Sequence, residues 1–162
     1  MRKIFYLFIG LLSWSNLFSL GLFCKFEEVY QNGEVQTGHL LIQESDLRYE
    51  YFDSNLFTII YVNEKLILID NQDKNKFQMI EEENTIIPEI INIYKDFPDT
   101  RDNYKLKGYD LSIEKQHSNL FIKRLAIKSE NINSSIYFFE CKNTNIDKLY
   151  FEFNPFKDYV SN

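Results

Sequence analysis

Few side chains in this sequence are suited to metal or nucleophilic chemistry. The chain has two histidines, His39 and His117, and two cysteines, Cys24 and Cys141. Neither histidine has a cysteine or carboxylate at a metal-ligand spacing, and no glycine-rich phosphate loop, nucleophile elbow or H-E-x-x-H motif occurs. We therefore predict no catalytic residue, no metal site and no cofactor, and we expect a binding protein rather than an enzyme.

The first residues have the pattern of a signal peptide. A short basic start, MRK, precedes an apolar run over residues 4–12, and small residues at Ser19 and Gly21 suit cleavage by signal peptidase. We predict that residues 1–21 are removed and that residues 22–162 form a single domain in the periplasm. An uncleaved membrane anchor has less support, because polar residues interrupt the apolar run well short of a membrane span.

Export determines how the cysteines are interpreted. In an oxidising compartment, Cys24 and Cys141 are candidates for a disulfide that joins the mature N-terminus to a late strand. Two unpaired thiols are one alternative, and a lipoprotein lipidated at Cys24 is another. Phe23 argues against lipidation, because a bulky residue directly before the cysteine does not suit that processing site.

Composition limits the fold class and the partners. Aromatic residues make up 17% of the 162 residues, which suits a β-rich globular domain and excludes a disordered chain. The formal net charge of −6 argues against nucleic acid and against an anionic membrane surface as partners.

Short apolar runs separated by turns recur along the chain. Asn32-Gly33 is a strong hairpin turn signal, and the runs that follow are short and closely spaced. Consecutive short strands with tight turns predict an antiparallel meander or barrel. The predicted strands are residues 26–30, 39–43, 47–51, 57–62, 66–69, 77–80, 104–106, 109–113, 120–127, 136–141 and 149–153.

One segment, residues 85–97, has the pattern of an amphipathic helix. Its apolar residues occupy an arc of about 160° at 100° per residue, and polar residues fill the other side. Thr85 is the predicted N-cap, Pro88 falls in the first turn, and Pro98 ends the helix.

The strands between residues 47 and 70 are apolar on both faces. Phe57, Ile59 and Tyr61 share one face of their strand, yet Ile60 on the other face is also apolar. One short helix would not seal this much apolar surface, so either the chain dimerises or a ligand fills a cavity beneath the helix. We favour a monomer with a strongly curved antiparallel sheet, or incomplete β-barrel, and a helical lid over an apolar concave face.

Several motifs in a fixed order then resemble a known family. They are GHLLI from Gly38, DLRYEY from Asp46, IIYVNEKLILID from Ile59, NTIIPEIINIY from Asn84 and IDKLYFEFNPFKDYV from Ile146. In this order they resemble strands, the lid helix and the C-terminus of the periplasmic outer-membrane lipoprotein carrier family, the LolA-like proteins. The family's long helix before the first strand is missing, and its Arg-Pro is replaced by Gln43 and Glu44.

The resemblance implies a carrier, or chaperone, for lipoprotein transport. Such a protein takes lipoprotein acyl chains from an inner-membrane lipoprotein-releasing complex and delivers them to an outer-membrane acceptor. The alternative is a non-carrier lipid-binding or envelope interaction module of similar fold, including an outer-membrane acceptor anchored through Cys24.

We predict the acyl-binding residues by choosing one face of the strands. Leu47 and Tyr49 match family positions that line or border the acyl cavity, and Arg48 and Glu50 on the reverse face are expected to need water. The predicted acyl-binding residues are Leu47, Tyr49, Tyr51, Phe57, Ile59, Tyr61, Leu66 and Leu68 on the strands, with Ile87, Ile90, Ile91 and Tyr94 on the helix.

Overall fold

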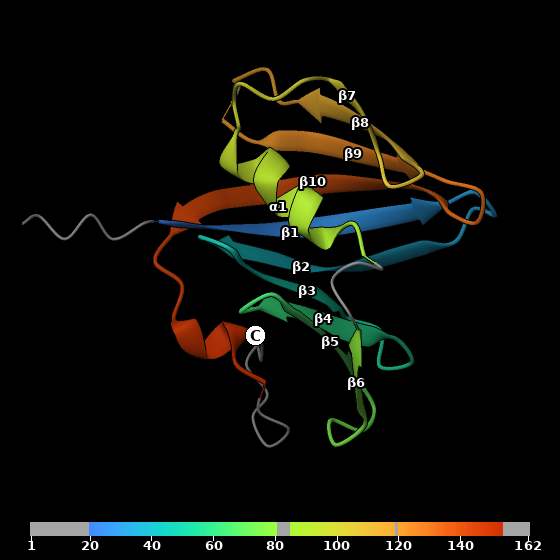
Figure 1. Ribbon diagram of the computed structural model, residues 1–162, viewed down its shortest axis with the longest axis vertical. Coiled ribbons are helices and arrows are strands. Elements are labelled where there is room, and N and C mark those ends of the chain that lie inside the picture. The colour runs from blue at the N-terminus through green and yellow to red at the C-terminus, as the bar shows by residue number, and fades with distance from the viewer. Residues whose placement is uncertain (1–19, 81–84, 119, 154–162) are drawn as a thin grey trace, which may run out of the picture.

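The computed structural model describes residues 20–80, 85–118 and 120–153, which form a ten-stranded antiparallel sheet and one α-helix (Figure 1). The predicted signal peptide lies outside the described residues except for Leu20 and Gly21. The mainly β, antiparallel architecture is confirmed. The elements are β1 (Gly21–Tyr30), β2 (Val35–Gln43), β3 (Asp46–Tyr51), β4 (Phe57–Val62), β5 (Lys65–Asp70), β6 (Phe77–Ile80), α1 (Ile87–Lys95), β7 (Asn103–Leu106), β8 (Tyr109–Lys115), β9 (Ile122–Lys128) and β10 (Asn133–Thr144).

The helix belongs to the connection between the two edge strands of the sheet. The order is β6-β5-β4-β3-β2-β1-β10-β9-β8-β7, so the first and last strands pair at the centre. Within the described residues the edge strands β6 and β7 do not pair with each other, and the sheet is not closed. Because α1 follows β6 and precedes β7, the chain crosses the sheet from one edge to the other through this helix (Figure 1).

The contacts of α1 require the sheet to curve. Ile91 of α1 lines one pocket together with Tyr61 of β4, whereas Glu89 is 3.1 Å from Lys107 in the turn between β7 and β8. Strands β4 and β8 are six positions apart, which would separate them by about 29 Å in a flat sheet. A nine-residue helix is only about 14 Å long. The sheet therefore bends toward the helix.

The helix forms where the sequence predicts it. Ile90, Ile91 and Ile93 are buried, and Pro88 lies in the first turn, where its missing N–H costs little. The N-cap position is Ile86 rather than Thr85, but the Thr85 hydroxyl still accepts a hydrogen bond from the Ile87 N–H at 3.2 Å. The prediction is confirmed for the helix and wrong by one residue for its cap.

The C-terminal segment covers the opposite face of the sheet. Ile146 and Phe151 pack with Leu41 of β2, and Phe153 packs against a second buried group of isoleucines, Ile60, Ile67 and Ile69. The two-faced strands are thus explained by the chain itself. The two explanations expected from the sequence, a dimer or a ligand cavity, are therefore not needed for this face.

Two expectations about this face are wrong. Residues 149–153 are not a strand, since residues Lys148–Phe151 form a 3-10 helix whose N-cap, Asp147, accepts a hydrogen bond from the Leu149 N–H. Arg48 does not sit in water, because it is only 4% exposed. Its guanidinium donates to Glu50 at 2.7 Å and to the Tyr150 carbonyl at 3.2 Å, so it fastens the C-terminal segment to β3.

Candidate functional site

Most of the predicted acyl-binding residues belong to one hydrophobic cluster, which also contains the apolar residues of α1. In this cluster the buried members are Leu47, Tyr49, Tyr51, Tyr61, Leu66, Ile90 and Ile91, and the half-buried members are Ile59, Ile87 and Tyr94. Phe57 is 37% exposed and rests its ring on Tyr51 at 5.5 Å, while Leu68 is half-buried in a pocket beside it. The structure brings ten of the twelve together, and their role as ligand contacts stays a prediction.

Tightly packed rings occupy the centre of this cluster. The Phe26 ring stacks on Tyr49 with centroids 4.0 Å apart and meets the edge of Tyr51 at 5.6 Å. Gly38 on the neighbouring strand is needed here, because a Cβ at this position would overlap the Phe26 ring and the Glu50 carbonyl. This part of the cluster is therefore dense core.

Glu28 is a buried carboxylate within the same cluster. It accepts hydrogen bonds from the hydroxyls of Tyr51 at 2.6 Å and Tyr49 at 3.0 Å, and Tyr30 lies 3.2 Å from the Tyr51 hydroxyl. Burial, followed by the nearby Glu28 charge, raises the pKa of Tyr49 and of Tyr51 well above the ordinary tyrosine value. Glu28 was not predicted from the sequence, although it lies two residues after Phe26 and therefore shares the inward face of β1.

A cavity of about 570 Å³ lies beside the C-terminal end of α1. Its apolar walls come from the start of β1, the end of β2, the end of α1 with the loop after it, and the start of β9. The exposed Leu20 and Leu120 also line it, and Glu44, Lys95 and Asn143 add polar groups. The apolar wall residues are Leu22, Ile42, Tyr94, Phe97, Pro98, Phe121 and Ile122.

Of the twelve predicted residues, Tyr94 alone lines this cavity. The other residues that line the cavity were not predicted, because they come from strand ends, from the loop after α1 and from the turn before β9. Leu20 would also leave the cavity if the chain is cleaved after Gly21, as the sequence predicts. The apolar run Leu120, Phe121 and Ile122, which follows directly on a turn, was the available signal in the sequence.

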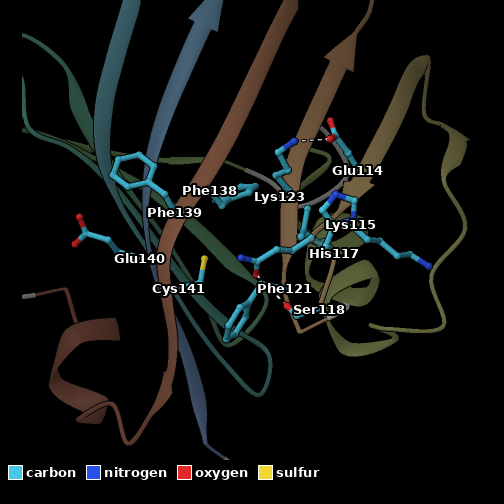
Figure 2. A pocket seen from close by; sticks show the side chains of 12 residues that line it. Glu114, Lys115, His117, Ser118, Phe121, Lys123, Phe138, Phe139, Glu140 and Cys141 are labelled. Carbon is cyan, nitrogen blue, oxygen red and sulfur yellow. Dashed lines mark hydrogen bonds and ion pairs between the residues drawn. The ribbon is translucent and has the colours of Figure 1, made fainter.

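A second cavity, of about 470 Å³, shares Phe121 and Ile122 with the first. Figure 2 shows the Phe121 ring and the Cys141 sulfur at one end of it and the Glu114–Lys123 ion pair at the other. Phe138 lines this second cavity, and its ring meets that of Tyr94 edge to face with centroids 6.0 Å apart. Tyr94, Phe121 and Ile122 thus lie between the two cavities.

Two lysines hold the chain on either side of α1. At its start, the Lys107 ammonium is 3.1 Å from Glu89 and donates to the Thr85 carbonyl at 3.2 Å. After its end, the Lys115 ammonium donates to the Pro98 and Thr100 carbonyls at 2.9 and 2.7 Å. Both lysines belong to the β7–β8 hairpin, so α1 is tied to the half of the sheet that follows it.

Cys24 and Cys141 form a disulfide across the central pair of strands. A bulge at Glu140, whose φ is 50°, shifts the β1–β10 register at this point and places the two cysteines with their Cα atoms 4.1 Å apart. The bond therefore joins the first described strand to the last.

The remaining chemistry of the described residues is limited. His39 lies between the rings of Phe23 and Phe52, and burial lowers its pKa. His117 is exposed at the second cavity. No group of three or more His, Cys, Asp or Glu side chains that could hold a metal ion occurs in the part of the chain that the structure describes. Nor does any helix within that part have the length and apolar character to cross a membrane.

The comparisons with known proteins leave the family open. No protein-family model matches the chain, and no curated protein matches it at a significant level. The cavity, its neighbouring residues and the motif resemblance are therefore the features that bear on function.

Proposed function

We propose that this protein is a periplasmic carrier that binds lipoprotein acyl chains in the cavity beside the C-terminal end of α1. The observation that carries the proposal is the cavity itself. Its volume of about 570 Å³ lies within the usual range of ligand sites, and most of the side chains that line it are apolar. The order of motifs that resembles the LolA-like family also supports a lipoprotein carrier.

The size of the hydrophobic effect makes such a site useful. An acyl chain of about twelve methylenes represents roughly 10 kcal/mol of transfer free energy. A carrier must offset most of this energy in water and still release its cargo to a membrane acceptor. A cavity at one end of the sheet, with Leu120 65% exposed beside it, offers an apolar path of entry.

The attachment of α1 suits reversible opening. Its ion pair with Lys107 is between partly exposed groups, and such pairs contribute only about 0 to 1 kcal/mol. We propose that α1 acts as the lid and that its displacement widens the cavity toward the buried isoleucines of the helix. The inner-membrane releasing complex and the outer-membrane acceptor are the partners that the resemblance implies, and the working form is a monomer.

Ligand binding by a charge variant tests this proposal. Leu120→Glu places a carboxylate at the cavity without disturbing buried packing, so it should weaken binding of a fluorescent fatty-acyl probe about tenfold, or roughly 1.4 kcal/mol. Leu149→Glu is the matched control, because Leu149 is a 39% exposed leucine on the C-terminal 3-10 helix, away from the cavity. Native mass spectrometry of protein expressed in the periplasm should show bound acyl species. A wild-type protein that binds no acyl probe would exclude the carrier.

An envelope interaction module of similar fold is the second candidate. Phe52, Tyr137 and Phe139 are exposed aromatic side chains on the sheet face away from α1, and they favour protein contacts. Absence of acyl species and of probe binding would favour this candidate. Its anchored form needs a lipid on Cys24, whose sulfur is already bonded to Cys141, so an intact-mass measurement separates the two.

A further inference from the structure

Strand β10 extends past the strand that accompanies it on one side. Its pairing with β9 ends at Tyr137, which lies opposite Arg124, whereas its pairing with β1 continues to Thr144 (Figure 1). Among the described residues, positions 138–144 therefore have β1 on one side and no paired strand on the other. An unpaired strand edge normally lies at the rim of a sheet, but this one belongs to a strand inside it.

The alternation of main-chain directions shows which groups face the open side of β10. Tyr30 faces β2, because its N–H donates to the Glu34 carbonyl at 2.9 Å. Successive residues of a strand direct their main-chain groups alternately to the two neighbouring strands, so Phe23 faces β10. Lys142 is the partner of Phe23 and therefore faces β1, and Asn143 directs its N–H and carbonyl to the open side. Such groups are able to pair with the backbone of another chain.

Both cavities border this open edge. Phe138 and Cys141 line the second cavity, on the wall that β10 forms in Figure 2, and Asn143 lines the cavity beside α1. The two cavities share Phe121 and Ile122. A ligand whose apolar part fills the cavity beside α1 can therefore continue along the edge of β10 as it leaves that cavity.

We propose that the open edge of β10, residues 138–144, binds the polypeptide part of a lipoprotein as an added β-strand. This inference rests on the proposed acyl-binding function and extends it, because the second contact recognises main chain rather than hydrocarbon. In an acylated protein, main-chain amides follow directly after the acyl group, so they reach Asn143 when the acyl chain lies in the cavity beside α1. Main-chain hydrogen bonds provide the affinity of an added strand, so one carrier can accept polypeptides of different sequence.

Three ligands with the same acyl chain test this contact. They are N-methyldodecanamide, a dodecanoylated hexapeptide amide of alternating serine and threonine, and the same acylated peptide with every peptide nitrogen methylated. Binding is measured by displacement of N-phenyl-naphthylamine. Wild type should bind the acylated peptide at least about fivefold more tightly than N-methyldodecanamide. The methylated peptide has no main-chain donors, so it should bind no more tightly than N-methyldodecanamide.

Hydrogen exchange of single backbone amides, followed by NMR, locates the added strand. In the free protein the N–H of Asn143 should exchange fast and that of Lys142 slowly, because only Lys142 faces β1. The acylated peptide should slow exchange at Asn143 at least about tenfold, whereas N-methyldodecanamide should change it by less than about twofold. Lys142 is the internal control, and its exchange should stay slow with every ligand.

The outcomes separate this inference from the proposed function. If wild type binds N-methyldodecanamide and the acylated peptide equally, or if the methylated peptide keeps the gain in affinity, the added strand is wrong while acyl binding stands. The same conclusion follows if the acylated peptide does not protect Asn143. If wild type binds none of the three ligands, the proposed function fails and this inference fails with it.

Discussion

Glu28 accepts hydrogen bonds from Tyr49 and Tyr51 inside the cluster that α1 covers. A carboxylate removed from water is tolerated when donors replace the lost hydration, and two phenol hydroxyls do this here. The bonds also fix the directions of both rings, which the stacking of Tyr49 on Phe26 alone would not do. Glu28 therefore favours one packing arrangement of the aromatic core.

Removing one of these donors should be costly. Tyr51→Phe leaves Glu28 with one hydrogen bond fewer, and a hydrogen bond to a charged group is worth about 1.5 to 3 kcal/mol. We expect the free energy of unfolding in urea to fall by about this amount at neutral pH. Tyr137→Phe is the control, because Tyr137 is exposed on the other face, and its unfolding should match wild type.

We also expect the stability of Tyr51→Phe to depend on alkaline pH differently from that of wild type. The pKa of Tyr51 is raised in the folded protein, so above about pH 10 the unfolded chain loses its proton first. The raised pKa of Tyr51 contributes nothing adverse below about pH 10, so the stability is complete there. As the pH rises further, the free energy of unfolding falls by up to about 1.4 kcal/mol per pH unit. Tyr51→Phe should lose stability less steeply between about pH 10 and 11. Equal slopes for the two proteins would contradict the prediction.

Sequence alternation was sufficient to place Tyr49 and Tyr51 on the same face, since both lie in a strand with period two, and both side chains are buried in one cluster. The reason for choosing that face as the inward one failed at Arg48, which was expected in water but is buried beneath the C-terminal segment. It failed at Glu28 for a related reason. Alternation identifies the face of a strand, but it does not identify distant residues that pair with a buried charge.

At the scale of elements, α1 depends on the β7–β8 hairpin that follows it. Lys107→Ala removes the ion pair with Glu89 and the bond to the Thr85 carbonyl. Because Lys107 is 41% exposed, we expect the stability of the whole domain to change little. The backbone amides of α1 should nevertheless exchange hydrogen roughly two- to fivefold faster, since local opening becomes easier.

The control for the helix variant is Lys105→Ala. Lys105 belongs to the same hairpin but is 89% exposed, and its ammonium lies 3.5 Å from Asp110, a residue of the hairpin itself. Its replacement should leave exchange in α1 unchanged. If the backbone amides of α1 exchange hydrogen at the same rate in both variants, the Lys107 contact does not restrain the helix.

Elements with a clear local signal were predictable, and those determined by distant contacts were not. Ten of the eleven predicted strands have counterparts, because short apolar runs between turns carry their own signal. Residues 149–153 alternate like a strand, yet Lys148–Phe151 form a 3-10 helix that packs Phe151 against Leu41 and Ile146 on the far face. The cavity was missed for the same reason, since its walls come from five separate segments.

At the scale of the whole molecule, the disulfide is the strongest single constraint. It links residues 117 apart in sequence, and closing so long a loop contributes about 4 to 5 kcal/mol in the chain-entropy model. The double variant Cys24→Ser, Cys141→Ser should unfold at correspondingly lower urea concentration. A reducing agent should lower the stability of wild type toward that of the variant and leave the variant itself unchanged.

The central pairing of β1 with β10 also determines the order in which the sheet can be completed as the chain is synthesised. Strands β1 to β6 form a meander of neighbours, so each can pair as soon as the next strand is free to fold. The other edge of β1 has to wait for β10, the last strand of the described sheet, and until then its backbone groups are open to pairing with another chain. The growing chain therefore passes through an interval in which a folded half-sheet exposes its future centre, and aggregation competes with completion of the fold at that edge.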